Sequence, residues 1–222
     1  MSAFAEDAAT LDDEATSRLV DRLATQGFAV ADGLLPPALV AGLLSELHGL
    51  EQAGLLSGAG VGRDAGLRRD GDIRRAAIRW FDGGTAAERA FLALADGLKT
   101  AINRRLFLGL FDFECNFIAY PVGGFYGRHL DSLAGAKNRV VSLVAYLDPD
   151  WSAEDGGFLR VWSAPDDHGA PAEAIQPMAG RIVLMLSEEI PHEVLPAHRP
   201  RHAIAGWWRV NGSSANRLDP AR

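Results

Sequence analysis

The first third of the chain carries apolar residues at the three- and four-residue spacing that is typical of helices. One stripe recurs at every fourth position, at Leu11, Ala15, Leu19 and Leu23, and a second stripe occupies Leu39, Val40, Leu43, Leu44, Leu47 and Leu50. We expect Gly27 to end the first helix and Pro36 and Pro37 to open the second, because proline is well tolerated in the first turn of a helix. The apolar residues 28–30 between them predict a short strand.

A third helix is expected to begin at residue 85. Thr85 and Glu88 have the spacing of a capping box, in which two side chains satisfy the first free amides of a helix. The apolar residues that follow lie on one face, at Phe91, Leu94, Leu98 and Ile102. The first 110 residues are therefore predicted to be mainly helical.

From Phe111 onward the apolar residues recur at every second position. Apolar side chains at the odd positions 111–119 alternate with a mainly polar set, as in a strand with two different faces. Further apolar runs cover residues 140–147, 158–162, 181–187 and 202–208. Helices followed by many short strands predict an α+β domain with an antiparallel sheet. We expect a jelly roll (double-stranded β-helix) core with supporting N-terminal helices.

The length favours one domain. A chain of 222 residues can bury a core without disulfides, and its single Cys115 has no partner for one. We interpret residues 1–222 as one domain, with helical support and a substrate loop in 1–110 and the jelly-roll core in 111–210.

Charge and hydropathy disfavour several classes of partner. The balance of 22 basic and 29 acidic residues gives a net charge of −7, which disfavours a nucleic-acid partner. The acidic N-terminus lacks the features of a signal peptide, and no stretch approaches eighteen uninterrupted apolar residues. These observations predict a cytoplasmic protein that neither crosses nor binds a membrane.

The candidate chemistry begins at His129 and Asp131. Residues i and i+2 of an extended chain face the same side, so this pair can offer two ligands to one metal ion. His192 follows the most apolar strand and comes 61 residues after Asp131. Two histidines and one carboxylate on one face of an octahedral ion are typical of non-haem Fe(II) oxygenases. Zinc is the poorer interpretation, because Cys115 lies on an apolar face.

The other four histidines are assigned no such role. We expect His48 to be an ordinary helix residue and His168 and His198 to be solvated. His202 is expected to point away from the pocket side of its strand.

Arg201 and Tyr146 form a candidate anion receptor. Arg201 begins an apolar strand, where an unpaired charge would be costly, so it requires a buried anion. A guanidinium group and a phenol hydroxyl together bind a carboxylate well in a dry pocket. Trp207 is expected on the same strand face as Arg201.

Four segments carry a family resemblance. In order, these are residues 120–131, 139–151, 156–160 and 191–207, and the first of them contains the His-x-Asp pair. Their residues resemble the prolyl 4-hydroxylase type of Fe(II)- and 2-oxoglutarate-dependent dioxygenase, close to the hypoxia-inducible-factor prolyl hydroxylases and their bacterial counterparts. The opening residues 27–47 are similar to the N-terminal layer of that family.

The resemblance implies a role for each matching residue. His129, Asp131 and His192 would hold Fe(II), and Arg201 and Tyr146 would bind the distal carboxylate of the co-substrate 2-oxoglutarate. The residues expected to line the co-substrate pocket are Tyr120, Val144, Leu159, Val194 and Trp207. Those expected near the prime substrate are Tyr126, Arg139, Arg74 and Trp80. The reaction would also use O2, with ascorbate as reductant.

The implied activity is hydroxylation of a peptidyl proline in an intracellular protein, with release of succinate and CO2. Ala76 stands where related enzymes often have an acid, four residues before Trp80, and this keeps open the same chemistry on a small molecule or on another amino-acid side chain. A nucleic-acid demethylase and a non-catalytic jelly-roll binding module are further alternatives. Residues 57–79, with six arginines and three aspartates, are interpreted as a mobile loop that grips the substrate.

Overall fold

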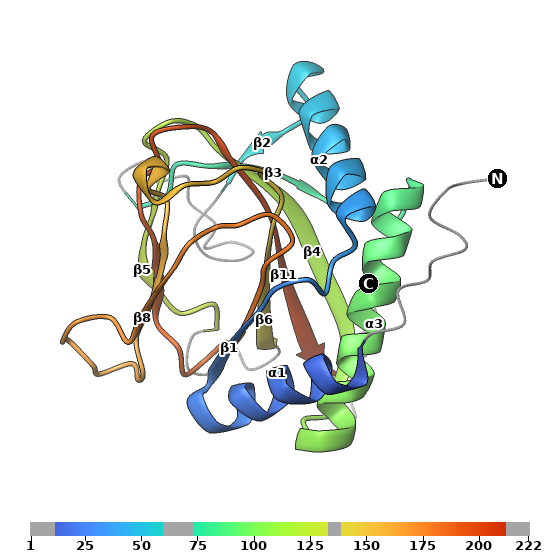
Figure 1. Ribbon diagram of the computed structural model, residues 1–222, viewed down its shortest axis with the longest axis vertical. Helices are drawn as coiled ribbons and strands as arrows, with labels where there is room; N and C mark the ends of the chain where they lie inside the picture. Colours follow the sequence, from blue (N-terminus) through green and yellow to red (C-terminus); the bar gives the residue numbers. More distant parts are fainter. Residues whose placement is uncertain (1–11, 60–72, 133–138, 212–222) are drawn as a thin grey trace, which may run out of the picture.

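Two antiparallel sheets face each other in the computed structural model, which describes residues 12–59, 73–132 and 139–211. The larger sheet has the order β1 (Phe28–Ala31), β9 (Ile182–Leu186), β6 (Arg139–Tyr146), β11 (Arg201–Val210), β4 (Leu110–Tyr120), β3 (Ala77–Trp80) and β2 (Ser57–Gly58). The smaller has the order β5 (Tyr126–His129), β10 (His192–Val194), β7 (Leu159–Val161) and β8 (Glu173–Ile175). The predicted α+β jelly roll is confirmed (Figure 1).

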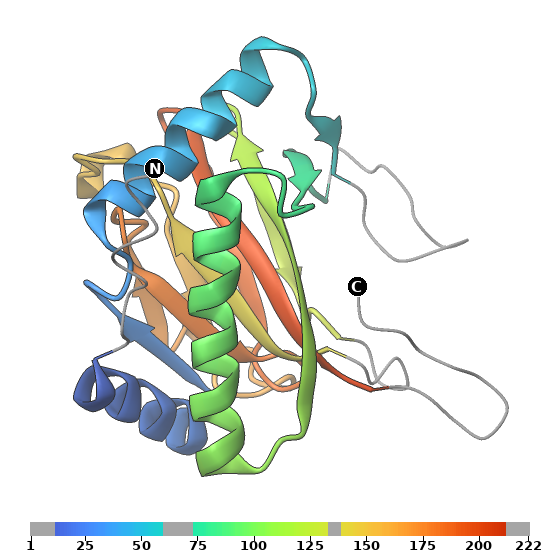
Figure 2. The same ribbon diagram turned by 90° about the vertical axis from the view of Figure 1, so that its right-hand side faces the viewer.

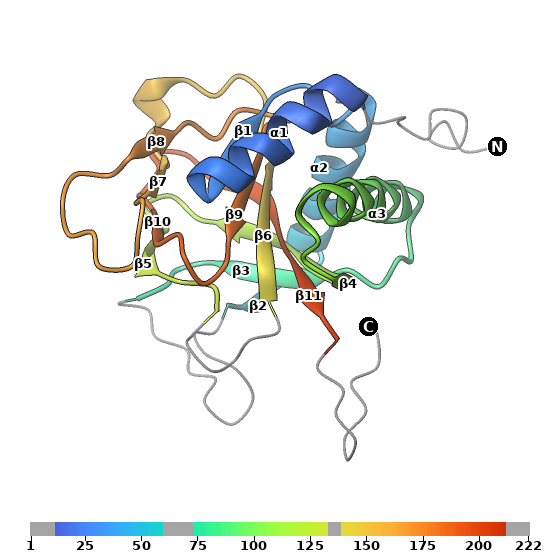
Figure 3. The same ribbon diagram turned by 90° about the horizontal axis from the view of Figure 1, so that it is seen from below.

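Three helices cover the outer face of the seven-stranded sheet (Figure 2). They are α1 (Asp13–Gln26), α2 (Pro37–Gln52) and α3 (Ala86–Leu106), and a short 3-10 helix η2 covers Ala153–Asp155. In Figure 3 the helices lie on one side of the large sheet and the small sheet lies on the other. The three predicted helices are confirmed; Leu11, assigned to the first stripe, lies outside the described residues.

The helix ends follow from local chemistry. The Asp12 carboxylate accepts hydrogen bonds from two amides of the first turn of α1, and Gly27 closes that helix with a φ of 75°, a conformation that favours glycine. Thr85 Oγ1 accepts the Glu88 N–H at 3.0 Å, as the capping pattern predicts. The Glu88 carboxylate instead accepts amides of the preceding turn, the shortest at 2.7 Å from Gly83.

Alternate residues of the large sheet pack into two different hydrophobic cores. On β11, Ile204 and Trp208 pack with the helices, whereas Ala203 packs between the sheets with Tyr146 and Val183. Side chains of a strand point alternately to its two faces, which separates the two sets. The inner core therefore lies where a site between the sheets would need apolar walls.

The polar positions of β4 are buried rather than solvated. Asp112 accepts two hydrogen bonds from Arg209, at 2.7 and 3.1 Å, and both side chains are buried. Glu114 is also buried and accepts two from Arg139, at 2.6 and 2.8 Å. The alternating pattern of this strand thus separates a helix-facing apolar side from an inner side that contains paired charges.

The interpretation of residues 57–79 as one irregular loop is wrong at both of its ends. β2 pairs with β3, β3 pairs with β4, and Arg74 forms a β-bridge with Tyr126. These backbone hydrogen bonds hold residues 77–80 within the large sheet and residues 73–75 beside β5 of the small sheet. Residues 60–72, including three of the six arginines, lie outside the described part of the chain.

Across the described residues, no helix has the length and apolar character required to span a membrane.

Candidate active site

His129, Asp131 and His192 converge at one end of the small sheet. His129 ends β5, His192 begins β10, and the two residues are directly paired in the ladder. The Asp131 carboxylate lies 3.5 Å from His129 Nε2 through one oxygen and 3.6 Å from His192 Nε2 through the other. Neighbouring ligand atoms of an octahedral ion are about 3.0 Å apart when each bond is about 2.1 Å. The three groups therefore lie close enough together to bind one divalent ion after a small adjustment of their side chains.

Both imidazoles are oriented by backbone carbonyls. His129 Nδ1 lies 2.8 Å from the Gly127 carbonyl oxygen, and His192 Nδ1 lies 3.0 Å from that of Ile190. A carbonyl can only accept, so each Nδ1 carries the proton and each Nε2 keeps its lone pair for an ion. A hydrogen bond from the ring nitrogen that does not bind the metal is the usual support of a ligating histidine.

The electrostatics keep His192 and Asp131 in the protonation states that a metal ion requires. Burial and the neighbouring His129 imidazole lower the pKa of His192 to about 4, so this ring is neutral at physiological pH. Burial by itself raises the pKa of Asp131, but the adjacent His192 and His129 outweigh it and hold the pKa of that carboxyl well below its usual range. The anionic Asp131 carboxylate and the neutral His192 imidazole therefore lie together beside His129.

Arg201 is a buried cation without a carboxylate partner. Its side chain leaves β11 in the large sheet and Nη1 donates to the Gly157 carbonyl, at 2.6 Å, beside β7 in the small sheet. Arg201 Nε is buried with no hydrogen-bond partner, and within the described part of the chain no acidic group forms an ion pair with this guanidinium. A buried charge left in this state favours an anionic ligand.

Two tyrosines flank the Arg201 guanidinium. Its central carbon lies 4.3 Å from the ring centre of Tyr120 and 5.8 Å from that of Tyr146. The Tyr146 hydroxyl is buried without a partner, and burial raises its pKa to about 12, so it remains a neutral donor. Arg201 and Tyr146 thus offer unused hydrogen-bond donors to one small volume.

The predicted pocket residues form the apolar wall between these two groups. Tyr120, Tyr146, Leu159 and Val194 belong to the core between the sheets, and Val144 packs against it. Val194 lies two residues after His192 on β10 and pairs with Leu159. The wall therefore extends from the histidine cluster to Arg201.

Trp207 occupies a different part of the inner face. It is six residues from Arg201, about 20 Å along an extended strand. Its ring centre lies 3.7 Å from the Arg139 guanidinium carbon and 6.1 Å from the half-exposed Trp80 ring. The structure groups Trp207 with two residues assigned to the substrate side, and separates it from Arg201.

Tyr126 and Arg74 lie directly beside the histidine cluster. The Tyr126 ring stacks on the His129 ring, with 3.6 Å between the ring centres. Arg74 forms a β-bridge with Tyr126, and its guanidinium carbon lies 4.6 Å from the Tyr126 ring centre. The Tyr126 pKa is raised by burial to about 12. These two side chains form an edge of the site on the side of the arginine-rich segment.

Gly157 is a site residue that the sequence analysis includes only within the segment 156–160. It has a φ of 67°, and a Cβ atom placed there would lie 2.9 Å from Ala197 Cβ and 3.3 Å from Arg201 Cδ. Its carbonyl holds the guanidinium, so the absent side chain and the backbone oxygen together position Arg201. The signal in the sequence was the Gly-Gly pair before the short strand.

Comparison with known proteins places the chain in a family. Residues 115–209, which include all three members of the histidine cluster and Arg201, match the model of the 2OG-Fe(II) oxygenase superfamily. A solved prolyl-4-hydroxylase from Pseudomonas putida is 42% identical, with a TM-score of 0.79, over 87% of this chain and 98% of that one. This chain belongs to the prolyl 4-hydroxylase type of 2OG-Fe(II) oxygenase. It is thus an enzyme of a class that uses Fe(II), 2-oxoglutarate and O2.

Animal prolyl hydroxylases are more distant members of the same family. A prolyl hydroxylase solved with a hypoxia-inducible-factor peptide from Trichoplax adhaerens is 28% identical, with a TM-score of 0.78, over 91% of this chain and 95% of that one. The hypoxia-inducible factor prolyl hydroxylase of Caenorhabditis elegans is 29% identical over 82% of this chain and 26% of its own length. The chain therefore spans about a quarter of the length of the first curated relatives that it matches.

Proposed function

We propose that this oxygenase hydroxylates a proline residue of a protein or peptide, with conversion of 2-oxoglutarate and O2 to succinate and CO2. The observation that carries the proposal is the pairing of a His-Asp-His cluster with the buried, unpaired Arg201, joined by one apolar wall. The 42% identity to the Pseudomonas putida prolyl-4-hydroxylase supports proline as the target.

His129, Asp131 and His192 are the residues that would hold Fe(II). Bound there, the ion with O2 and the keto acid supplies the oxidising power for an unactivated C–H bond. The two backbone-oriented imidazoles and the carboxylate leave the remaining positions of an octahedral ion free for the reactants.

Arg201 and Tyr146 would bind the distal carboxylate of 2-oxoglutarate. Two N–H donors of the guanidinium fork and the Tyr146 hydroxyl match the acceptors of a carboxylate, and this pairing offsets the desolvation of both charges. Tyr120, Val144, Leu159 and Val194 exclude water along the chain of the co-substrate. Trp207 would line the end of this pocket away from Arg201.

The substrate side is assigned to Tyr126, Arg74, Arg139 and Trp80. Tyr126 and Arg74 stand next to His129, where a target residue must come close to the reacting centre. Arg139 is held by Glu114 and Trp207, so it would shape this side as a fixed group. Ala76 packs against the inner core, and no acid stands at that position.

The decisive experiment is a coupled assay on the purified chain. With Fe(II), 2-oxoglutarate and ascorbate, which we propose as the reductant, succinate formation should depend on a proline-containing peptide and the peptide should gain 16 Da. The same peptides with alanine in place of proline are the control. Succinate release with a proline-independent product would contradict the peptidyl target and favour a small molecule or another side chain. Binding of 2-oxoglutarate without metal or turnover would instead favour a binding module.

The cytoplasmic location expected from the sequence stays a prediction. A fractionation of cells that produce the chain would test it.

A further inference from the structure

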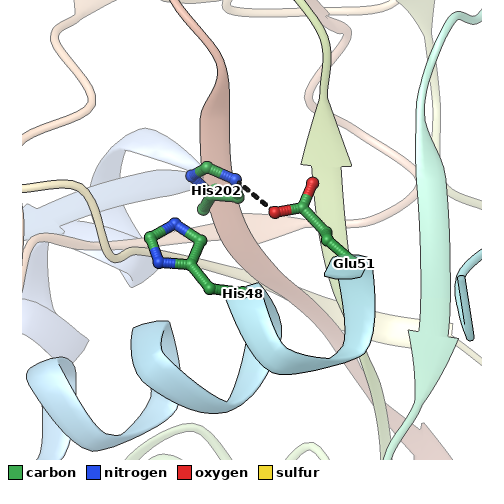
Figure 4. A group of neighbouring side chains, drawn as sticks. All are labelled: His48, Glu51 and His202. Atoms are coloured by element: carbon green, nitrogen blue, oxygen red, sulfur yellow. Dashed lines mark hydrogen bonds and ion pairs between the residues drawn. The ribbon is translucent and has the colours of Figure 1, made fainter. Parts of the chain in front are cut away.

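A second cluster of metal-ligating side chains lies on the other side of the large sheet. His48 and Glu51, three residues apart on α2, face His202 on β11 (Figure 4). His202 Nε2 lies 3.1 Å from Glu51 Oε2, and the His48 and His202 ring centres are 4.8 Å apart. One ligand atom from each of the three residues lies within 4.8 Å of the others.

His202 is held in the orientation of a metal ligand. Its Nδ1 lies 2.6 Å from Asp148 Oδ1, and the other oxygen of the same carboxylate accepts the His202 backbone N–H at 2.5 Å. Both side chains are buried. A carboxylate on one ring nitrogen fixes the imidazole and makes the other nitrogen a better donor, as in the carboxylate–histidine–zinc arrangement. Asp148 therefore directs His202 Nε2 toward the space beside His48 and Glu51.

An ion pair of a protonated His202 is a second explanation for the positions of Asp148 and Glu51. Burial lowers the pKa of His202, but the hydrogen bonds and charges of Asp148 and Glu51 outweigh it and raise that pKa above its ordinary value. A protonated His202 between two carboxylates would explain the positions of Asp148 and Glu51. It would not explain why the exposed His48 is in edge contact with the same ring.

We propose that His48, Glu51 and His202 bind Zn²⁺ or a similar divalent ion, with Asp148 as the positioning residue. Ligand atoms of a tetrahedral zinc ion are about 3.3 Å apart for bonds of about 2.0 Å. His48 and Glu51 are exposed side chains of α2, so changes in their rotamers alone can bring their ligand atoms to this separation from the buried His202. This inference does not rest on the proposed hydroxylase activity.

The geometry also gives the ion a route and a free position. Glu51 borders a surface hollow of about 570 Å³ that is further lined by Arg75, Tyr120 and Pro200. Three protein ligands leave the fourth position of zinc to water. Because His48 and Glu51 are exposed, the ion can reach the cluster from solvent without opening the fold.

The test counts zinc on the full chain without a histidine tag. The Asp131→Ala variant removes the carboxylate of the first cluster, and adding His48→Ala to it separates zinc on the second cluster from any zinc left on His129 and His192. Calorimetry and elemental analysis after gel filtration should give one zinc per chain. In this background His48→Ala and Glu51→Gln should each weaken binding by at least about tenfold, whereas His168→Ala, which removes an exposed histidine elsewhere, should not.

Cobalt provides a spectroscopic readout that a structural role would not produce. Co²⁺ in the Asp131→Ala chain should give visible absorption bands of a four-coordinate site, and these should disappear with His48→Ala. The proposal is overturned if the Asp131→Ala chain binds no zinc, or if His48→Ala binds it as tightly as His168→Ala. It is equally overturned if Glu51→Gln lowers the melting temperature of the metal-free chain while zinc binding is unchanged, because Glu51 would then serve only an ion pair.

Discussion

The two His/carboxylate clusters have the same donors in different surroundings. In the first, His129 and His192 are paired across two strands, and backbone carbonyls orient both rings. In the second, two of the three donors are exposed side chains of a helix, and only His202 is fixed. The Asp131 oxygens lie 3.5 and 3.6 Å from the two imidazoles of the first cluster, and Glu51 Oε2 lies 3.1 Å from His202 Nε2 in the second, so the clusters differ in how their donors are held rather than in these distances. Identical residue types therefore give a preformed site only where the backbone holds them.

The clusters also differ in what lies beside them. An unpaired buried Arg201 and the unpaired Tyr146 hydroxyl adjoin the wall of the first. Around the second, the described buried groups are paired with one another, as Asp148 is with His202. Under the proposals above, the first cluster would combine an ion with an organic anion, whereas the second would hold an ion and a solvent molecule.

The largest effect is expected from Asp131→Ala. Two imidazoles alone hold Fe(II) poorly, so succinate formation should fall by more than about 100-fold and the iron content of the purified chain should drop to background. Asp96→Asn, which removes an exposed carboxylate on α3, is the matched control. Retention of iron and turnover by the Asp131→Ala chain would remove the distinction between the clusters.

Arg201→Gln should raise the KM for 2-oxoglutarate. A hydrogen-bonded charge contributes about 1.5–3 kcal/mol, equivalent to a rise of about 10- to 100-fold. Iron content should be unchanged, because Arg201 forms no part of the His-Asp-His cluster. Arg199→Gln, a partly exposed arginine nearby, serves as the control. An unchanged KM with lost iron would show that Arg201 supports the metal rather than the co-substrate.

The sequence predicted the first cluster and missed the second for a physical reason. His129 and Asp131 share a local spacing, and an arginine in an apolar strand signals a buried anion. His48 and His202 are 154 residues apart, and their meeting depends on how α2 docks across β11. No local period encodes that docking.

The fold shows the same difference between elements with a local sequence pattern and elements placed by distant partners. Long apolar stripes predicted all three helices and the strands β4, β6, β9 and β11. The strands β2, β3, β5, β8 and β10 have two to four residues, too few to establish an alternation. Their positions follow from partners in the sheets, as the β-bridge of Arg74 with Tyr126 illustrates.

Tyr146→Phe should have a smaller effect than Arg201→Gln. Loss of one neutral hydrogen bond costs about 0.5–1.5 kcal/mol, so the KM for 2-oxoglutarate should rise about 2- to 10-fold. The ring would stay in the core, and kcat should change little. Steady-state kinetics with 2-oxoglutarate as the varied reactant measure the effect, and a kcat loss at constant KM would contradict the assignment.

The smallest effect is expected from zinc on the second cluster. At a zinc concentration of about ten times Kd, binding should stabilise the Asp131→Ala chain by about 1.4 kcal/mol, or about 3–6 °C in melting temperature. Adding His48→Ala should abolish the shift. A shift that survives this change would place the zinc elsewhere.

Gly157 has a consequence for the choice of keto acid. The Gly157 carbonyl and the Tyr120 ring hold the Arg201 guanidinium in place. The Arg201 side chain passes so close to position 157 that only glycine leaves room for it. Under the proposed function, a guanidinium held in this place would set the interval between the distal carboxylate of the keto acid and the histidine cluster. A five-carbon diacid of fixed length would span that interval, while homologues one carbon shorter or longer would fail to reach both ends at once.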